Sequence, residues 1–576
     1  MSNLHPGLIL LLVGVIAAIV PKNIRKYVMA VGPAVALAAV FTLDQGDLWV
    51  VPFINGMQLH LMVVDKLSWI FVAIFTLLAF MGGIYAMHND SWAEALASMS
   101  YAGSTVCMVL AGDWVTLLFF WELMAITSLY LIWANHTARS RRAGFRYIMV
   151  HFFGGNMLLF GVVLKVTGGD FLVSNLTANH DLAFWLILIA VCINSVVPPL
   201  HAWVADAYPE STITGGVFMS SLTTKAGIYV MIRLFAGTDW LIWVGVIMAI
   251  YGAIFAIIEN DMRRLLSYHI VSQLGFMVAG VGLGTGMALD GATAHAVTNV
   301  LQKSMLFMCA GAVMYSTGRR KLNELGGLAK QMPLLCVFFL IAAFSISGVP
   351  LFDGFVAKSI TISAAAEAGN GAMELLLSLA SIGTFLSITL KMTYFMFFAP
   401  AQNGLEIKRP IPKNMMVAMG IAAFMNIIFG IVPSLLHNAL PYPIEYHAYT
   451  VDHLTQYVEV LVASMIPFLV YLAHMMPHSK LALDFDWFYR KPLVSCVSWI
   501  SSLCCAIRDG LGGMFRGMVD GLKPFMDNPV AFMGRTWNGT IPKQYDADQY
   551  RPEIGEVMLV DFLILAVAIA IFWVLM

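Results

Sequence analysis

The stretch NSVVPPLHAWVADAYPES, residues 194–211, lies inside an apolar run that is long enough to cross a membrane. A second stretch, ISGVPLFDGFVAKSITIS at residues 346–363, interrupts another apolar run in the same manner. Proline removes an amide donor and clashes with the preceding helical turn, so each run predicts a broken helix. Within a membrane, a broken helix is tolerated only where protein buries it or where it lines a wet cavity.

The two interruptions are also related by their positions in the chain. Pro199 and Pro350 are 151 residues apart, and this distance corresponds to five apolar runs. A shift by an odd number of helices reverses the direction of each crossing, so spans 4 to 8 and 9 to 13 are predicted to form an inverted repeat. HFFGGNMLLFG at 151–161 and NVLQKSMLFMCAG at 299–311 support this repeat, with an offset of 148 residues. Paired broken helices in inverted repeats are typical of a transport site near the middle of the membrane.

The composition excludes a water-soluble protein. Of the 576 residues, 60% are apolar and only 11% are charged, whereas a soluble domain has about 25% charged residues. The formal net charge of −1 provides no global field that would attract nucleic acid. The seven cysteines form no C-x-x-C pair and no cluster with histidine at metal-ligand spacing. We therefore expect no metal site and no cofactor, and the absence of a phosphate-binding loop argues against a nucleotide site.

We predict an all-α polytopic membrane protein with about 14–16 transmembrane helices, since a crossing takes about 20 apolar residues. The sixteen apolar runs lie near residues 7–20, 27–43, 67–87, 94–112, 114–133, 146–167, 183–203, 213–234, 240–258, 265–284, 291–314, 333–366, 372–398, 411–436, 452–476 and 556–576. Loops after odd-numbered runs contain most of the lysine and arginine, as in residues 139–146 and 319–330. Because basic loops stay in the cytoplasm, the N-terminus is predicted to lie outside.

These spans divide the chain into six parts. We predict N-terminal helices, a first five-helix repeat, a second inverted repeat, C-terminal helices, an amphipathic segment and a last transmembrane helix. The corresponding boundaries are 1–93, 94–235, 240–398, 399–476, 477–555 and 556–576. In the amphipathic segment, apolar residues such as Met514, Phe515 and Met518 recur near helical spacing beside Arg508 and Arg516. This pattern is typical of an interfacial helix, although a loosely packed extension is the alternative.

Five ionisable residues lie within the predicted spans, namely Glu122, Lys225, Lys303, Lys358 and Lys391. A charged side chain at the centre of a membrane costs at least about 2.5–3.5 kcal/mol, so each of these residues is a candidate for function. Lys391 is close enough to the end of its span for its amine to reach the interface instead, and Lys165 is interpreted in that way.

Histidines extend the series of titratable groups. His295 precedes Lys303 by eight residues and would share one helix face with it. His269, near the start of its span, is either a relay member or an interfacial histidine. Because a buried lysine loses its preference for the charged state and a nearby carboxylate restores it, Glu122 and Lys225 would form a proton switch if they approached and separated. Alternatively, these residues could bind an organic anion.

Several strings resemble the antiporter-like subunit family. They are FFWELM at 119–124, PLHAWVADAYPES at 199–211, LTTKAGIY at 222–229, RRLLSYHIVSQLGF at 263–276 and GVPLFDGFVAK at 348–358. This family comprises the large proton-channel subunits of respiratory complex I and of membrane-bound hydrogenases, and the A and D subunits of Mrp-type cation/proton antiporters. The resemblance covers residues 60–400 and is greatest to the D subunit of Mrp antiporters, chiefly through LTTKAGIY.

The resemblance implies roles for individual residues in proton translocation. Glu122 matches the family's glutamate on the fifth helix and Lys225 its central lysine on the eighth. His295 with Lys303 matches the region that leads to the second half, and Lys358 matches the ionisable residue of the second broken helix. One position differs, because Asn194 stands where the family usually has a lysine that pairs with the glutamate. Asn194 is therefore only a possible relay member, and Glu122 either pairs with Lys225 or is protonated at rest.

The resemblance also implies a setting and a set of partners. We expect a proton-translocating subunit of a multisubunit Mrp-like antiporter in the inner membrane, acting with other membrane subunits on protons and on Na⁺ or K⁺. Residues 477–555 resemble the lateral helix by which the largest family members hold their neighbours. The chain has no catalytic site of its own. It would be part of an enzyme only as a subunit of a proton-translocating oxidoreductase, of the NADH-quinone or hydrogenase type. A subunit that drives inorganic-carbon uptake and a solitary carrier of an organic anion are further alternatives.

Overall fold

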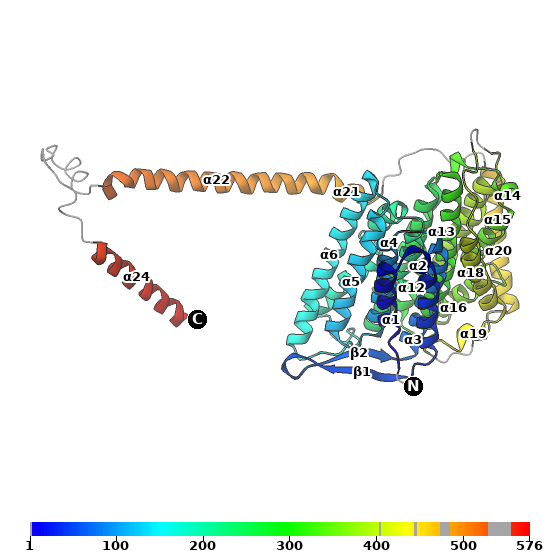
Figure 1. Ribbon diagram of the computed structural model, residues 1–576, viewed down its shortest axis with the longest axis horizontal. Coiled ribbons are helices and arrows are strands. Elements are labelled where there is room, and N and C mark those ends of the chain that lie inside the picture. The colour runs from blue at the N-terminus through cyan, green and yellow to red at the C-terminus, as the bar shows by residue number, and fades with distance from the viewer. Residues whose placement is uncertain (1–2, 402–404, 443–445, 473–483, 528–553, 576) are drawn as a thin grey trace. The chain divides into compact units, whose positions relative to one another are not determined.

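The computed structural model describes residues 3–401, 405–442, 446–472, 484–527 and 554–575. The chain forms two units, of which the first ends at Asp484 and the second begins at Phe485. The first unit is a bundle of helices (Figure 1). The second contains α21 (Asp486–Arg490), α22 (Pro492–Asp527) and α24 (Ile554–Leu575).

The first unit begins with two helices and a β-hairpin. Its elements are α1 (Pro6–Ile19), α2 (Lys22–Val40), β1 (Gly46–Pro52), η1 (Ile54–Gly56), β2 (Gln58–Val64), α3 (Lys66–Tyr85) and η2 (Ala86–His88). The strands pair antiparallel and lie at the end of the bundle where the N-terminus is found (Figure 1). Our sequence prediction contained no strands, because this hairpin is a short connection between two long apolar runs.

The next elements cover the region that the sequence predicts as the first repeat, and they contain two interruptions. They are α4 (Trp92–Leu110), α5 (Trp114–Trp133), α6 (Ala138–Thr167), α7 (Leu182–Asn194), α8 (Ala202–Ala207), η3 (Tyr208–Glu210), α9 (Gly215–Met219) and α10 (Leu222–Phe235). The break after α7 is the one that the prolines predict. The break between α9 and α10 was not predicted, because it falls at Ser220 and Ser221 and involves no proline.

The region that the sequence predicts as the second repeat has its own broken helix. Its elements are α11 (Trp240–Ile258), α12 (Met262–Leu283), α13 (Gly286–Thr317), η4 (Leu322–Glu324), α14 (Leu328–Gln331), α15 (Pro333–Ser347), α16 (Asp353–Glu367) and α17 (Gly371–Thr384), followed by the π-helical turns η5 (Phe385–Met392) and η6 (Tyr394–Phe398). The first unit then continues with α18 (Lys413–Ile431), α19 (Ser434–His437) and α20 (Val451–Tyr471).

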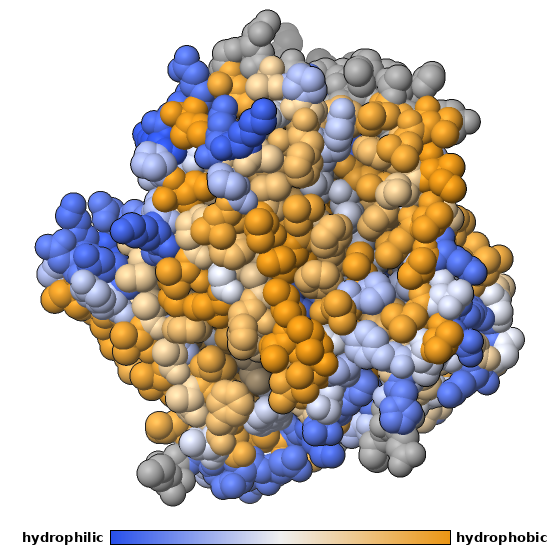
Figure 2. Space-filling model, turned by 90° about the vertical axis from the view of Figure 1, so that its right-hand side faces the viewer, coloured by the Kyte–Doolittle hydropathy of each residue, from blue (hydrophilic) through white to orange (hydrophobic). Residues whose placement is uncertain are grey.

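The helices confirm the predicted polytopic membrane fold. Among the described residues, ten helices are long and apolar enough to cross a membrane. The shorter apolar helices include α7 and α15, which are the first halves of the two broken helices predicted from proline. Apolar side chains cover much of the surface of the first unit (Figure 2). In contrast, α12 and α13 are almost completely buried, so most of the polar residues of these two helices lie inside the protein.

The second unit is built around the long helix α22. Its 36 residues include the apolar side chains Met514, Phe515 and Met518, all of which are exposed within this unit. Arg508 forms an ion pair with the neighbouring Asp509 on the same helix. Residues 528–553 of the predicted amphipathic segment lie outside the described residues.

Candidate functional site

Lys225 is held at the interruption between α9 and α10. Its side chain is completely buried, and Nζ donates a hydrogen bond of 3.1 Å to the carbonyl of Ser220. Carbonyls at the end of a helix have no partner within that helix. The break therefore provides an acceptor for the amine within the protein core.

The other intramembrane lysines also donate to main-chain carbonyls. Lys358 Nζ lies 2.7 Å from the carbonyl of Ile346, in the last turn of α15 before the break. Lys303 Nζ lies 3.1 Å from the carbonyl of Leu266 on α12. Lys391 Nζ lies 2.8 Å from the carbonyl of Glu259, just after α11 ends.

None of these four lysines forms an ion pair with a carboxylate of the described residues. A carbonyl oxygen accepts a hydrogen bond from an ammonium and from a neutral amine alike. The arrangement therefore allows each lysine to gain or lose a proton without losing its partner.

Two buried histidines of α12 and α13 are held by side chains of neighbouring helices. His269 Nε2 lies 2.6 Å from the hydroxyl of Ser387 in η5. His295 Nε2 lies 3.1 Å from Oε1 of Gln273, whose amide donates to Thr384 at 3.2 Å. The Nδ1 atoms of both rings have no hydrogen-bond partner among the described residues.

The structure brings five of the predicted residues into one region. The positive charges of Lys225 and Lys358 interact electrostatically with Lys303. Those of Lys303 and Lys358 interact in the same way with His269. His295 interacts electrostatically with Lys358 and Lys225. All five side chains are buried, so the region is a cluster of titratable nitrogen atoms inside the bundle.

Glu122 lies apart from Lys225. It is half-buried on α5, and its carboxylate packs directly against Gly155 of α6, where any side chain would collide with it. Within the described residues, no hydrogen bond or ion pair joins Glu122 to Lys225, whose amine is instead bonded to Ser220. Asn194 is the last residue of α7, is buried, and has an Nδ2 atom without a partner in the described structure.

The structure adds a buried carboxylate that the sequence analysis missed. Asp353 is the first residue of α16, directly after the second break, and its carboxylate accepts hydrogen bonds from Ser345 and, at 3.1 Å, from Gln302. Its second oxygen has no partner among the described residues. The string GVPLFDGFVAK contains this residue, but only the folded break shows that it is buried.

A second missed group joins residues that are far apart in the sequence. Asp484 accepts hydrogen bonds from Tyr268 at 2.8 Å and from Tyr251, and it lies 3.2 Å from Nε2 of His201 in the first broken helix. Although burial by itself raises the pKa of Asp484, its bonds to His201, Tyr251 and Tyr268 hold that pKa well below the usual value. Asp484 is therefore a carboxylate at neutral pH.

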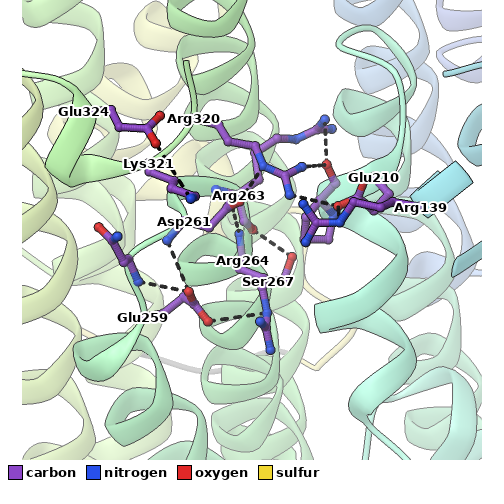
Figure 3. A network of polar contacts seen from close by, with 12 residues as sticks. Arg139, Glu210, Glu259, Asp261, Arg263, Arg264, Ser267, Arg320, Lys321 and Glu324 are labelled. Atoms are coloured by element: carbon purple, nitrogen blue, oxygen red, sulfur yellow. Dashed lines mark hydrogen bonds and ion pairs between the residues drawn. The ribbon is translucent and has the colours of Figure 1, made fainter. Parts of the chain in front are cut away.

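Charged residues also connect the two repeats at one end of the bundle (Figure 3). Arg320 bonds to Asp261 at 2.6 Å and to Glu210 at 2.9 Å, while Arg263 donates to the carbonyl of Ser211 at 2.6 Å. The network lines a cavity of about 680 Å³ that is open to solvent. The cavity opens beside Ala205 and Asp206 of α8 and beside Pro209 of η3, in the second half of the first broken helix.

Residues 111–399 match the family described as NADH:quinone oxidoreductase/Mrp antiporter, TM. The chain belongs to this family. The eight residues that we selected from the sequence, from Glu122 to Lys391, all lie within the matched region.

Relatives in this NADH:quinone oxidoreductase/Mrp antiporter family include named antiporter subunits. The chain is 27% identical over 410 residues to a probable K(+)/H(+) antiporter A/B subunit of Rhizobium meliloti, and the match covers 65% of this chain and 41% of that protein. It is 28% identical over 437 residues to the Na(+)/H(+) antiporter A subunit of Alkalihalophilus pseudofirmus, covering 67% of this chain and 54% of the relative. The chain thus spans only about half of these two proteins.

Solved structures of other membrane complexes share the fold. A chain of the Mrp complex from Dietzia sp. matches with a TM-score of 0.68 and 24% identity, over 81% of this chain and 98% of that chain. A chain of the membrane-bound sulfane sulfur reductase, an archaeal respiratory membrane complex, matches with a TM-score of 0.70 and 20% identity. That match covers 98% of this chain and 99% of the other.

Proposed function

We propose that this chain is a proton-translocating membrane subunit of a multisubunit Mrp-like antiporter that exchanges protons for a monovalent cation. The observation that carries the proposal is the buried cluster of Lys225, His269, His295, Lys303 and Lys358. Ionisable groups inside a membrane protein typically mark an ion pathway. The antiporter names of the relatives support the choice of Na⁺ or K⁺ as the other ion.

Like charges within the cluster would drive the proton forward. Because Lys225 and Lys358 both act on Lys303, a proton on one of these amines disfavours a proton on the next. His295 and His269 would carry protons between the lysines, since imidazole exchanges protons in the physiological pH range. In this scheme Lys358 passes the proton toward the side of release, and Lys391 is the last residue of the proton path. Glu122 is the proton carrier of the other half-path.

Other membrane subunits would complete the transporter, with the long helix α22 offering an apolar surface for contact. The chain would lie in the inner membrane with its N-terminus outside, according to the distribution of lysine and arginine in the loops. The domain boundaries expected from the sequence belong to this proposal, with residues 94–235 and 240–398 forming the two half-paths.

A transport assay of the intact complex tests the proposal. Liposomes that contain the purified complex and a trapped pH indicator should lose an imposed pH gradient when NaCl or KCl is added. Lys225→Ala should slow this loss by about tenfold or more, because a proton carrier has been removed. Lys165→Ala is the matched control, since this lysine is paired with Asp170 at the end of α6. Cation-dependent transport at the normal rate in Lys225→Ala would contradict the proposal.

A subunit of a redox-driven complex is the second candidate function. The share of the chain that the structural matches cover favours it. The match to the sulfane sulfur reductase chain includes nearly the whole protein, whereas the match to the Mrp chain covers 81% of it. The same proton path would then be driven by electron transfer in partner subunits. Purification of the complex distinguishes the candidates, because a redox complex contains iron–sulfur or flavin subunits. A large cytoplasmic partner without redox centres would instead favour inorganic-carbon uptake.

A further inference from the structure

His151 of α6 is a buried histidine that neither the sequence analysis nor the scheme above uses. Its side chain is only 3% exposed, and Nε2 has no hydrogen-bond partner among the described residues. The ring packs against Tyr147, with the centroids 4.2 Å apart, and against Trp203 at 4.6 Å. Two aromatic rings therefore hold the imidazole in place while one ring nitrogen stays without a partner.

The packing of α5 on α6 places the Glu122 carboxylate one helical turn from His151 along α6. The Glu122 carboxylate lies on Gly155, and the Ser128 hydroxyl lies 2.7 Å from that of Tyr147. His151 is halfway between Tyr147 and Gly155 on α6. It is one helical turn, or about 6 Å, from the residue that Glu122 touches. Residues four apart share a helix face, so the imidazole lies on the same side of α6 as the carboxylate.

The other side of His151 faces the first proline-induced break. The side chain of Asn194, at the end of α7, lies beside the ring. The Trp203 indole that packs on His151 donates to the carbonyl of Ile193 at 3.1 Å, so the ring is tied to the end of α7. His151 thus lies between Glu122 and the broken helix.

From Asn194 the polar atoms continue toward Lys225. The backbone of Asn194 and Ser195 packs on Gly227 of α10, two residues after Lys225. The Asn194 amide, the Ser195 hydroxyl and the Thr224 hydroxyl are buried without a partner among the described residues. Buried polar atoms of this kind are where proteins hold internal water. A row of polar groups therefore leads from His151 to the helix that contains Lys225.

We propose that His151 carries protons between Glu122 and Lys225. The O–H bond of the Glu122 carboxyl breaks as one ring nitrogen gains the proton. The N–H bond of the other ring nitrogen then breaks as a proton passes on, and the Lys225 amine gains an N–H bond, so the ring ends neutral. The inference rests on the proposed proton-translocating function and adds a residue to its first half-path. It also accounts for Asn194, because the titratable group that a lysine would place there is supplied by α6.

The test uses the intact complex in liposomes of phosphatidylethanolamine and phosphatidylglycerol, with the pH-gradient assay. His151→Gln keeps a polar side chain and His151→Phe keeps the aromatic packing, and both should slow cation-dependent proton movement by about tenfold or more. Asn194→Lys, combined with His151→Gln, should restore most of the rate, because it returns a titratable amine to the same place. His180→Gln is the control, since this histidine is exposed and stacks on Phe184.

The outcomes separate this inference from the proposed function. A normal rate in His151→Gln would overturn the inference, and so would a loss that Asn194→Lys fails to restore, since that result marks His151 as a packing residue. If the unmodified complex moves no protons in response to cations, the proposed antiport fails instead. The infrared carboxyl band of Glu122, identified by its loss in Glu122→Gln, then decides the inference. This band should shift in His151→Gln and not in His180→Gln, and an unchanged band would overturn the inference.

Discussion

At the scale of single residues, the intramembrane lysines are held by backbone carbonyls, and none of them pairs with a carboxylate in the part of the chain that the structure describes. Three of these amines reach carbonyls near the ends of helices, at Ser220, Ile346 and Glu259. The negative end of a helix dipole stabilises a cation there without adding a full opposite charge. Such a partner lets the proton leave more readily than a buried ion pair would, because an ion pair leaves an unpaired charge when it breaks.

The position of the Glu122 carboxylate depends on one glycine of the neighbouring helix. A methyl group at Gly155 would collide with the carboxylate, whereas a methyl group at Gly154 would meet the Ile193 side chain, at a close 3.3 Å that a small shift of this side chain relieves. We therefore expect Gly155→Ala to displace Glu122 and to slow proton movement by about tenfold or more. Gly154→Ala should leave the rate within about twofold of normal. The gradient assay in liposomes measures both, and equal rates in the two variants would contradict this view of Glu122.

At the scale of elements, the breaks carry backbone strain as well as polar groups. Val196 in the first break and Leu351 in the second have φ angles of 60° and 75°. Such angles are unusual for residues with a side chain, and they persist only where the surrounding fold imposes them. The same feature at both breaks indicates that the chain is held in this form by its neighbours. One such contact is the bond of 3.2 Å from the Leu351 amide to the hydroxyl of Tyr449.

Glycine should relieve this strain at Leu351. The left-handed conformation costs about 1–2 kcal/mol for a residue with a side chain, and glycine costs about 0.5–1 kcal/mol through its freedom in the unfolded chain. The Leu351 side chain is 60% exposed, so little packing is lost. Leu351→Gly should therefore leave the free energy of unfolding unchanged or raise it by up to about 1 kcal/mol.

The control for this variant is another exposed leucine, Leu375 within α17. Leu375→Gly should lower the free energy of unfolding by about 1 kcal/mol, because glycine weakens a regular helix. Unfolding of the purified protein in detergent measures both changes. A similar loss of stability in the two variants would show that Leu351 is not strained.

At the scale of the first unit, an ionic network joins the two repeats. Arg320 comes from the second repeat and binds Glu210 of the first as well as Asp261 of its own. Both carboxylates are largely buried, so each needs a partner to offset the loss of water. The network therefore ties the broken helices of the first repeat to the start of α12.

Removal of Arg320 should weaken this connection. Arg320→Gln removes the cation that contacts both Asp261 and Glu210 and should lower the free energy of unfolding by about 2 kcal/mol. Arg139→Gln is the matched control, because Arg139 is exposed and lies 3.9 Å from Glu210. That variant should change stability by less than about 0.5 kcal/mol. Thermal unfolding in detergent distinguishes the two, and an equal effect would contradict the assigned role of Arg320.

A structural feature of this protein can be predicted from the sequence when its physical cause lies within a few neighbouring residues. Pro199 and Pro350 predicted two broken helices, because the loss of an amide donor acts within one turn. The break at Ser220 and Ser221 was missed, since no residue there forbids a helix and the packed neighbours decide it. The β-hairpin at 46–64 was also missed, because a two-stranded sheet is stable only when it packs on the rest of the protein.

Some candidate functional residues can likewise be recognised from neighbouring sequence, whereas others depend on the packing of helices. Lysines and acids within apolar runs can be recognised without a structure, because a charge in the middle of a membrane span is costly and therefore rare. Asp353 and His151 were overlooked, since their burial depends on neighbouring helices and not on adjacent residues.

The sequence by itself therefore determined that this chain is a helical membrane protein with two broken helices and ionisable residues within its spans. These properties follow from hydrophobicity and proline geometry, which act locally. The tertiary structure alone decided which carbonyls hold the lysines, that Glu122 lies on Gly155, and that His151 lies beside Asn194 one helical turn from Gly155. Those contacts join distant parts of the chain, and only the packing of helices brings them together.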